Sequence, residues 1–265
     1  MAIKQIAPKK VKAKKERKKP IYYIAPTLLL VFIILLLEFL VVALEISRTV
    51  LPAPHTIWIS MRANFMRDIL PHMLLTLRVI LTGYFVAIPI GMMIAAISSQ
   101  FNLLIKAITP LNILLVVTPM ITLVPLFMMW MGFDTRVRII VVILQATPVI
   151  AINTLSGFSR TEREKLELMR SMGASRFQTF FKVVCPNALP HVFTGLKLGC
   201  IFSTIAAMSA DIAAGREGLG FRIQMYAGLV MTEMGFGTIL VVVIIGLTLF
   251  QIVSAIERRV VVWVK

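Results

Sequence analysis

Residues 159–190 read SRTEREKLELMRSMGASRFQTFFKVVCPNALP, a charged stretch in the middle of a chain that is otherwise mostly apolar. Of the 265 residues, 58% are hydrophobic and only 15% are charged. Ordinary soluble domains are roughly 45–50% apolar and about 25% charged. The composition therefore predicts an integral membrane protein that keeps one long charged segment outside the lipid.

Long apolar runs lie on both sides of the charged stretch, and they reach the ~20 residues that a helix needs to cross a bilayer. Helices are the expected element, because backbone groups in lipid must be hydrogen-bonded internally and the alternating pattern of barrel strands is absent. The predicted fold class is all-α: an integral membrane helical bundle with six transmembrane helices, at residues 21–44, 73–98, 103–131, 139–158, 192–214 and 236–256.

The distribution of basic residues predicts how the chain is organised and oriented. Lys and Arg are concentrated in a tail (1–20), in the charged loop (159–191) and near the C-terminal tail (259–265). Six spans place all three on one side, which the positive-inside rule identifies as the cytoplasm. The remaining parts are a first span with an external loop (21–72) and a core domain (73–258). We expect a multi-pass protein of the cell membrane with both termini in the cytoplasm.

The formal net charge of +16 raises nucleic acid as a possible partner. Much of this charge lies in the tail directly before a membrane span, where attraction to anionic lipid is worth about 1 kcal/mol per basic residue. Membrane lipid is therefore the expected partner of the tail, and no nucleic-acid binding is expected.

Small residues recur at every fourth position in two of the spans. Residues four apart lie on one face of a helix, and small ones let a second backbone approach closely, which favours helix association in lipid. These faces are predicted packing seams: Gly83, Ala87, Gly91 and Ala95 in the second span, and Gly195, Gly199, Ser203 and Ala207 in the fifth. The pattern leaves open whether each seam meets a helix of the same chain or of a second copy.

Prolines and polar groups within the spans are candidates for a translocation pathway. Pro119 and Pro125 favour a pathway element in the third span, because broken helices in transport proteins line cavities. Lys197 needs a partner, a watery cavity or a route to the interface, and it lies near enough to a span end that snorkelling is favoured over a substrate role. Asp211 opens the glycine-rich stretch ADIAAGREGLGF and is the better candidate for fixing a re-entrant or gate segment. The candidate pathway residues are Thr118, Thr122, Asn153, Thr204 and Asp211, although the hydroxyl and amide groups could equally bond within the bundle.

The charged stretch has the start and stop signals of two short helices. Thr161 with Glu164, and Ser175 with Gln178, have the spacing of capping boxes, which begin helices. Gly173 and the later Pro186 are expected to end them. The sequence therefore predicts helix, tight turn, helix.

Both predicted helices of the hairpin carry apolar stripes. On the second, four residues spaced i, i+3, i+4 and i+7 form a face that must pack on the bundle or on another protein: Phe177, Phe180, Phe181 and Val184. On the first, the stripe is narrower: Leu166, Met169 and Met172. A hairpin held to the bundle on one side could dock in a groove of a partner on the other. The alternative is a solvated loop with no partner.

The order Glu167, Gly173, Val183 and Pro186 resembles the "EAA" loop of ATP-binding cassette (ABC) importer permeases, whose pattern is Glu-Ala-Ala, three residues, Gly, nine residues, Ile-x-Leu-Pro. Here Leu168 and Met169 replace the alanines, Val183 replaces isoleucine and Cys185 replaces leucine. From about residue 70 onward, segments such as LVPLFMMWMGFD, RSMGASRFQTFFKVVCPNALP and ADIAAGREGLGF resemble the branch that serves sulfonate, taurine, nitrate and thiamine-precursor importers. Where that branch usually has a glutamate, this chain has Asp211.

The resemblance implies a core of five helices plus an added first span. It implies as partners a second permease copy, forming a homodimer, two cytoplasmic ATPase subunits and an external solute-binding protein. The residues it places at the ATPase-docking surface are Glu167, Leu168, Met169, Arg170, Gly173, Ala174 and Ser175. Those expected to support the loop are Phe177, Phe180, Phe181 and Pro186.

The sequence lacks the motifs of an enzyme. It contains no G-x-x-x-x-G-K-[ST] loop for phosphates, no H-E-x-x-H and no nucleophile elbow. No catalytic residue, metal site or bound cofactor is therefore expected on this chain, and ATP and Mg would be bound by the partner ATPase.

The expected function is the permease subunit of an ABC importer for a small solute such as a sulfonate, a nitrate-like anion or a vitamin precursor. One alternative is a secondary transporter driven by an ion gradient, which should show inverted repeats or acidic relays in the membrane. A second is a membrane anchor for a cytoplasmic complex that transports nothing.

Overall fold

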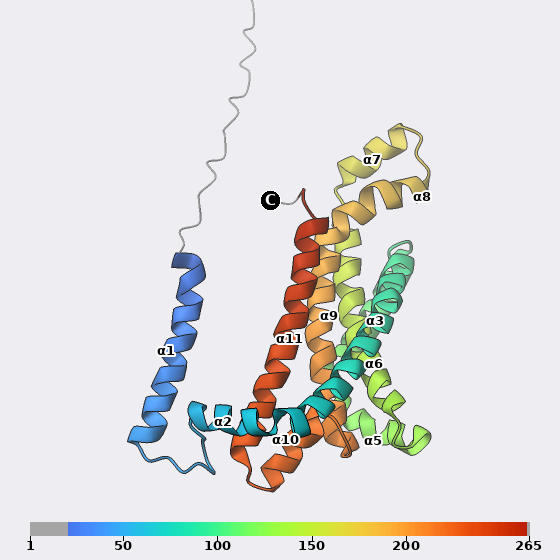
Figure 1. The fold of residues 1–265 in the computed structure, drawn as a ribbon. Coiled ribbons are helices and arrows are strands. Elements are labelled where there is room, and N and C mark those ends of the chain that lie inside the picture. The colour runs from blue at the N-terminus through green and yellow to red at the C-terminus, as the bar shows by residue number, and fades with distance from the viewer. Residues whose placement is uncertain (1–20, 264–265) are drawn as a thin grey trace, which may run out of the picture. The chain divides into compact units, whose positions relative to one another are not determined.

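The computed structural model describes residues 21–263, all of whose regular elements are helices (Figure 1). The predicted basic tail 1–20 lies outside the described residues. The chain divides into two units. The first ends at Ile46 and contains α1 (Ile21–Ala43), whose bounds match the first predicted span. From Thr27 on, most side chains of α1 are apolar and exposed, as a lipid-facing helix requires.

The second unit, from Ser47 on, is built around four long helices. These are α3 (Leu70–Ser98), α6 (Thr135–Ser159), α9 (Cys185–Ala214) and α11 (Thr232–Val260). α6 packs most extensively on α9 and α3, and α11 packs on α9. By length and hydropathy, four helical stretches of the described residues can cross a membrane, or five if one bent pair counts as a span. The count of six spans stays a prediction.

Short helices lie at both ends of this bundle. At one end are α7 (Arg163–Ser171), α8 (Arg176–Thr179) and the last turns of α11 (Figure 1). At the other end are α2 (Pro54–Asn64), α5 (Met120–Met131) and α10 (Leu219–Gly228). We call these the hairpin end and the far end.

The third predicted span is not one straight helix. α4 (Asn102–Val117) and α5 meet at an angle of 90° across Thr118 and Pro119. Pro119 lacks an N–H group and forces the residue before it out of the helical region, and Thr118 accordingly has ψ 122°. The bent pair together covers the predicted span 103–131, and its break lies at Pro119, one of the two prolines noted in that span.

Pro71 and Pro186 lie within long helices. A π-helical turn, η1 (Phe65–Ile69), precedes Pro71, and a second, η2 (Phe180–Val184), precedes Pro186. Such a wide turn leaves room for a proline ring that would otherwise clash with the carbonyl four residues earlier. As a result Pro54–Ser98 and Arg176–Ala214 run on as helices of 45 and 39 residues. The prediction that Pro186 ends a helix was wrong.

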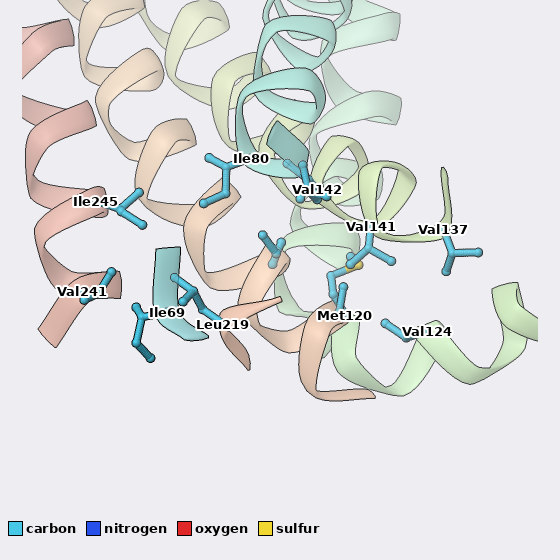
Figure 2. Close-up of a cluster of buried hydrophobic side chains, with 14 of the residues drawn as sticks. Ile69, Ile80, Met120, Val124, Val137, Val141, Val142, Leu219, Val241 and Ile245 are labelled. Atoms are coloured by element: carbon cyan, nitrogen blue, oxygen red, sulfur yellow. The ribbon is translucent and has the colours of Figure 1, made fainter. Parts of the chain in front are cut away.

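A hydrophobic core fills the bundle towards the far end (Figure 2). It joins side chains of η1, α3, α5, α6, α10 and α11, among them Ile69, Ile80, Met120, Val141, Leu219 and Val241. Every one of these six side chains is at least nine-tenths buried. The core fixes the short far-end helices to the long ones.

The glycines of both predicted seams face α6 of the same chain. A Cβ atom on Gly83 would lie 2.5 Å from Val142 Cγ1, and one on Gly91 would lie 2.8 Å from the Thr147 carbonyl. On α9, a Cβ on Gly199 would lie 2.7 Å from Ile150 Cγ1. Real Cβ atoms do not approach so closely, so only glycine allows these helices to pack at this distance. The four other seam residues, Ala87, Ala95, Ser203 and Ala207, are fully buried.

Candidate functional site

The helical hairpin at the hairpin end has the predicted order of helix, tight turn and helix. α7 ends in a Schellman motif, in which Gly173 N–H donates to the Arg170 carbonyl (2.9 Å) and Ala174 N–H to the Met169 carbonyl (3.0 Å). Gly173 has φ +72°, a conformation that glycine adopts without strain. The turn is therefore set by local backbone geometry, and no other atom lies near the position of a Cβ on Gly173.

One of the two predicted capping boxes is present. Gln178 N–H donates to Ser175 Oγ (3.2 Å), and Ser175 N–H donates to Gln178 Oε1 (2.9 Å). Thr161 does not cap α7, because that helix begins one residue later than expected, with Glu162 at the N-cap. The Thr161 hydroxyl instead donates to the Phe158 carbonyl at the end of α6 (3.3 Å). The second helix of the hairpin is thus the better capped.

The tip of the hairpin exposes apolar side chains. Leu168, Met172 and Phe177 are 61%, 73% and 72% exposed. Leu166 and Met169, predicted to share a stripe with Met172, are half-buried. The proposed docking residues Glu167, Arg170, Gly173 and Ser175 are also exposed, and Ala174 is half-buried. The surface thus combines large apolar groups with charges of both signs, which suits a protein partner.

The base of the hairpin is held to the bundle by few contacts. Phe180 packs on Phe158 of α6, with ring centroids 5.2 Å apart. Lys165 Nζ donates to Asn187 Oδ1 of α9 (3.5 Å). Phe177 and Phe181 pack on each other (4.4 Å) but remain exposed, so the predicted Phe177–Val184 stripe is not one buried face. The π-helical turn at η2 changes the angular spacing of side chains from Phe180 on.

A second polar site lies at the far end, around Asp211. Thr76 Oγ1 of α3 donates to Asp211 Oδ2 (2.6 Å), and Arg138 Nη1 of α6 donates to Asp211 Oδ1 (3.2 Å). The side chains of Arg138 and Asp211 are 4% and 0% exposed. A carboxylate so buried is stable only with partners of this kind, because the loss of hydration must be offset by charge and hydrogen bonds.

The loop between α9 and α10 closes over this carboxylate. Arg138 also bonds the Glu217 carboxylate and carbonyl. Gly218 N–H donates to His72 Nδ1 (3.0 Å), and Leu219 N–H donates to Thr76 Oγ1 (2.9 Å). Gly218 has φ +97°, and a Cβ there would lie 2.2 Å from Asp211 Oδ2. We call the set Thr76, Arg138, Asp211, Glu217 and Gly218 the clasp.

The other predicted pathway residues bond within their own helices or turns. The hydroxyls of Thr118 and Thr122 donate to the carbonyls of Leu114 (2.8 Å) and Pro119 (2.7 Å). Asn153 and Thr204 each donate to the carbonyl four residues earlier, as does the seam residue Ser203. The structure brings none of these side chains to the clasp, and only Asp211 belongs to it.

Lys197 is paired rather than snorkelling. Its Nζ lies 2.8 Å from Glu257 Oε2, which joins α9 to α11, and both side chains are about one-fifth exposed. A partner was one of the expected alternatives for Lys197, but the sequence did not identify it, because Glu257 is 60 residues away in the chain and only the packing of α11 on α9 brings it close.

Sequence reasoning missed most of the clasp. Thr76 carries no motif, Glu217 and Gly218 lie in the stretch ADIAAGREGLGF but were not singled out, and Arg138 looked like one of several basic residues outside the membrane. One available signal was an arginine in the first turn of an apolar span, four residues after Asp134, in a chain with few intramembrane charges. Over residues 21–263, no group of three His, Cys, Asp or Glu side chains could hold a metal ion.

The fold and these sites define a multi-pass helical membrane protein with a protruding helical hairpin. The family model for the binding-protein-dependent transport system inner membrane component matches residues 87–262, well over half of the chain. The chain belongs to this family.

Proteins similar to this chain include permease proteins of transport systems. The formylaminopyrimidine transport permease protein ThiX of Halalkalibacterium halodurans is 28% identical over 221 residues, covering 81% of this chain and 86% of its own. The taurine transport system permease protein TauC of Escherichia coli (strain K12) is 29% identical over 145 residues, covering 55% of this chain and 53% of its own. The MetNI methionine ABC transporter in an inward-facing conformation superposes with a TM-score of 0.60 at 18% identity, covering 72% of this chain and 95% of that chain, and shares the fold.

These findings confirm the resemblance noted in the sequence. The chain is the permease subunit of an ABC importer and is related to the sulfonate and taurine branch. The helical membrane fold is confirmed as well.

Proposed function

We propose that this subunit pairs with a second copy of itself to form a pathway for a small solute, which an external binding protein delivers. The hairpin α7–Gly173–α8 docks on a partner ATPase that holds ATP and Mg²⁺. The observation that carries this proposal is the exposed apolar tip, Leu168, Met172 and Phe177, on a capped hairpin that stands at one end of the bundle.

The orientation follows from charge. Basic residues are concentrated in the hairpin and near both ends of the sequence. By the positive-inside rule these segments face the cytoplasm. The far end, with α2, α5 and α10, then faces the binding protein. The solute is a sulfonate, a nitrate-like anion or a vitamin precursor, in keeping with relatives named for formylaminopyrimidine and taurine. The binding protein supplies the selectivity.

The hairpin is suited to pass on movement of the ATPase. α8 continues through η2 into α9 as one helix, so a displacement of the tip acts directly on the helix that carries Asp211. Closure of the ATPase around ATP shifts the population of the bundle between inward-open and outward-open states through this element.

The test is affinity purification of the chain from its own membranes, with identification of the bound proteins by mass spectrometry. Wild type should retain an ABC ATPase, and Glu167→Arg should lose it, because Glu167 is exposed at the tip. Glu233→Arg makes the same change at the far-end start of α11 and should keep the ATPase. Absence of an ATPase from the wild-type sample would overturn the proposal and favour an anchor or a secondary transporter.

A second variant tests coupling. Gly173→Arg should still insert and fold, because no atom lies within 4 Å of the new Cβ and the left-handed backbone at this position should cost only about 1 kcal/mol. It should abolish transport-coupled ATP hydrolysis in the reconstituted complex, because a long charged side chain then stands in the docking surface. Normal coupled hydrolysis in this variant would count against the hairpin as the coupling element.

A further inference from the structure

The loop between α9 and α10 is held on its inner side by polar bonds, and Leu219, directly after the loop, is fully buried in the hydrophobic core. Glu217, Gly218 and Leu219 bond to Arg138, His72 and Thr76. A cavity of about 220 Å³ adjoins the loop and is lined among others by Met128, Phe133, Asp134, Arg216 and Glu217. The polar bonds and the packing of Leu219 therefore fix the position of the loop, and the cavity leaves room beside it.

Arg138 is the centre of these bonds. Its guanidinium joins Asp211 of α9, Glu217 of the loop and Thr135 of its own helix. Arg216, next in the loop, lies 4.0 Å above the Phe133 ring at the corner between α5 and α6. Arg138 therefore links α6 to α9 and to the loop. The contact of Arg216 with the Phe133 ring links the loop to the corner between α5 and α6.

We propose that the clasp is the closing bond of the gate at the far end: Arg138 and Asp211 hold the α9–α10 loop shut, and opening towards the binding protein requires them to part. This inference rests on the proposed function, because it takes the far end as external. Arg138 and Asp211 are positioning residues that act through the loop.

The surroundings make such an opening reversible. A charge pair separated in the middle of the bilayer would leave both ions without water, which is strongly unfavourable. Here the cavity is lined by Arg138 itself, and the Glu217 side chain is 42% exposed, so water can reach the guanidinium once the loop moves. The pair Lys197–Glu257 joins α9 to α11 instead, far from this loop in the sequence, and serves as a natural control.

The experiment uses a cysteine reporter at Ala210, which is fully buried and adjoins Asp211. Cys185 and Cys200 are replaced by alanine, and a charged, membrane-impermeant maleimide is the probe. Labelling of Ala210→Cys should be slow with the clasp intact and several-fold faster with Arg138→Met. Lys197→Met, which breaks the other intramembrane ion pair, should leave the rate unchanged. Equal rates in all three would overturn the clasp as a gate bond.

The effect of nucleotide on labelling distinguishes a gating role of the clasp from a purely structural one. In the purified complex with an intact clasp, a non-hydrolysable ATP analogue should raise labelling of Ala210→Cys several-fold, and Arg138→Met should remove that dependence. No nucleotide effect in a complex that contains the ATPase would overturn the gate while leaving the proposed function standing. If no ATPase is recovered, the proposed function fails, and the Arg138→Met comparison still tests the clasp.

A second variant covers the case in which Arg138→Met does not insert. Gly218→Ala keeps every charge but places a Cβ 2.2 Å from Asp211 Oδ2, so it should force the loop away. Labelling of Ala210→Cys several-fold faster than with the clasp intact is expected, and labelling as slow as with the intact clasp would overturn the proposal.

Discussion

The hairpin and the clasp lie at opposite ends of the bundle, and each depends on a glycine in the left-handed region. Around Gly173 no atom lies within 4 Å of a Cβ position, whereas a Cβ on Gly218 would overlap the Asp211 carboxylate. At the hairpin the glycine serves the local turn and leaves the surface open to a partner. At the clasp it serves a close approach inside the protein. The same residue type thus marks an exposed docking element in one place and a tightly packed closure in the other.

The largest expected effect is at the clasp. Asp211→Asn keeps the shape but leaves Arg138 buried with only Glu217 as a charged partner, and breaking a buried pair should destabilise the fold by about 3 kcal/mol. The melting temperature in detergent should fall clearly. Asp134→Asn is the matched control, because Asp134 is an exposed N-cap residue and asparagine caps a helix equally well. Similar falls in melting temperature in both variants would show that the buried ion pair at Asp211 contributes no more to stability than the exposed N-cap at Asp134.

The two glycines can be compared directly. Gly218→Ala combines left-handed strain with steric overlap and should cost about 3 kcal/mol in the free energy of unfolding. Gly173→Ala meets only the strain and should cost about 1 kcal/mol. Thermal unfolding of the two variants side by side measures the difference. Equal costs would mean that the α9–α10 loop yields freely and that the clasp does not hold it.

At the hairpin a smaller effect is expected from the cap. Ser175→Ala removes the hydroxyl that accepts from Gln178 N–H, so α8 should lose about 1 kcal/mol of local stability. Amide hydrogen exchange at residues 176–179 should speed up by several-fold. Thr161→Ala is the control, since Thr161 caps no helix, and exchange in α7 should not change. Faster exchange in α7 would show that the Thr161 hydroxyl does support the hairpin.

The smallest effect is expected from the exposed ion pair of the hairpin. Lys165 Nζ lies 3.2 Å from Glu162, with side chains 46% and 62% exposed. Such pairs contribute little, so Lys165→Ala should change the free energy of unfolding by less than about 0.5 kcal/mol. A thermal melt at low and high salt checks this. A large, salt-insensitive loss would indicate that the bond to Asn187, rather than the ion pair, holds the hairpin to α9.

Local signals in the sequence predicted local structure well. The apolar runs indicated the long helices, the Ser175–Gln178 spacing indicated a true capping box, and the small-residue spacing of Gly83 and Gly199 indicated packing faces. Each of these is a pattern within a single helix or turn, so that its residues lie close together in the sequence. The docking role of the hairpin residues stays a prediction.

The features that were missed depend on distant residues or on competition between local effects. Arg138 and Asp211 are 73 residues apart, and nothing near either one shows that they meet. Pro186 was expected to end a helix, but the π-helical turn at η2 accommodates it. Pro119 does break its helix, and Thr118 before it takes an extended conformation, whereas Pro89 and Pro148 lie inside α3 and α6. Proline alone therefore does not determine whether a membrane helix continues.

The continuous helix from Arg176 to Ala214 has a consequence for how the chain can vary in length. It comprises 39 residues, with the hairpin turn just before it and Asp211 near its other end. One residue inserted into such a helix rotates everything beyond it by about 100° and shifts it by about 1.5 Å. An insertion or deletion within this helix would turn Asp211 away from Arg138 or point the hairpin tip in a new direction. Both the hairpin and the clasp would be affected even though every one of their residues was still present. Natural variation between the two sites should therefore consist of substitutions, with the number of residues between Gly173 and Asp211 unchanged.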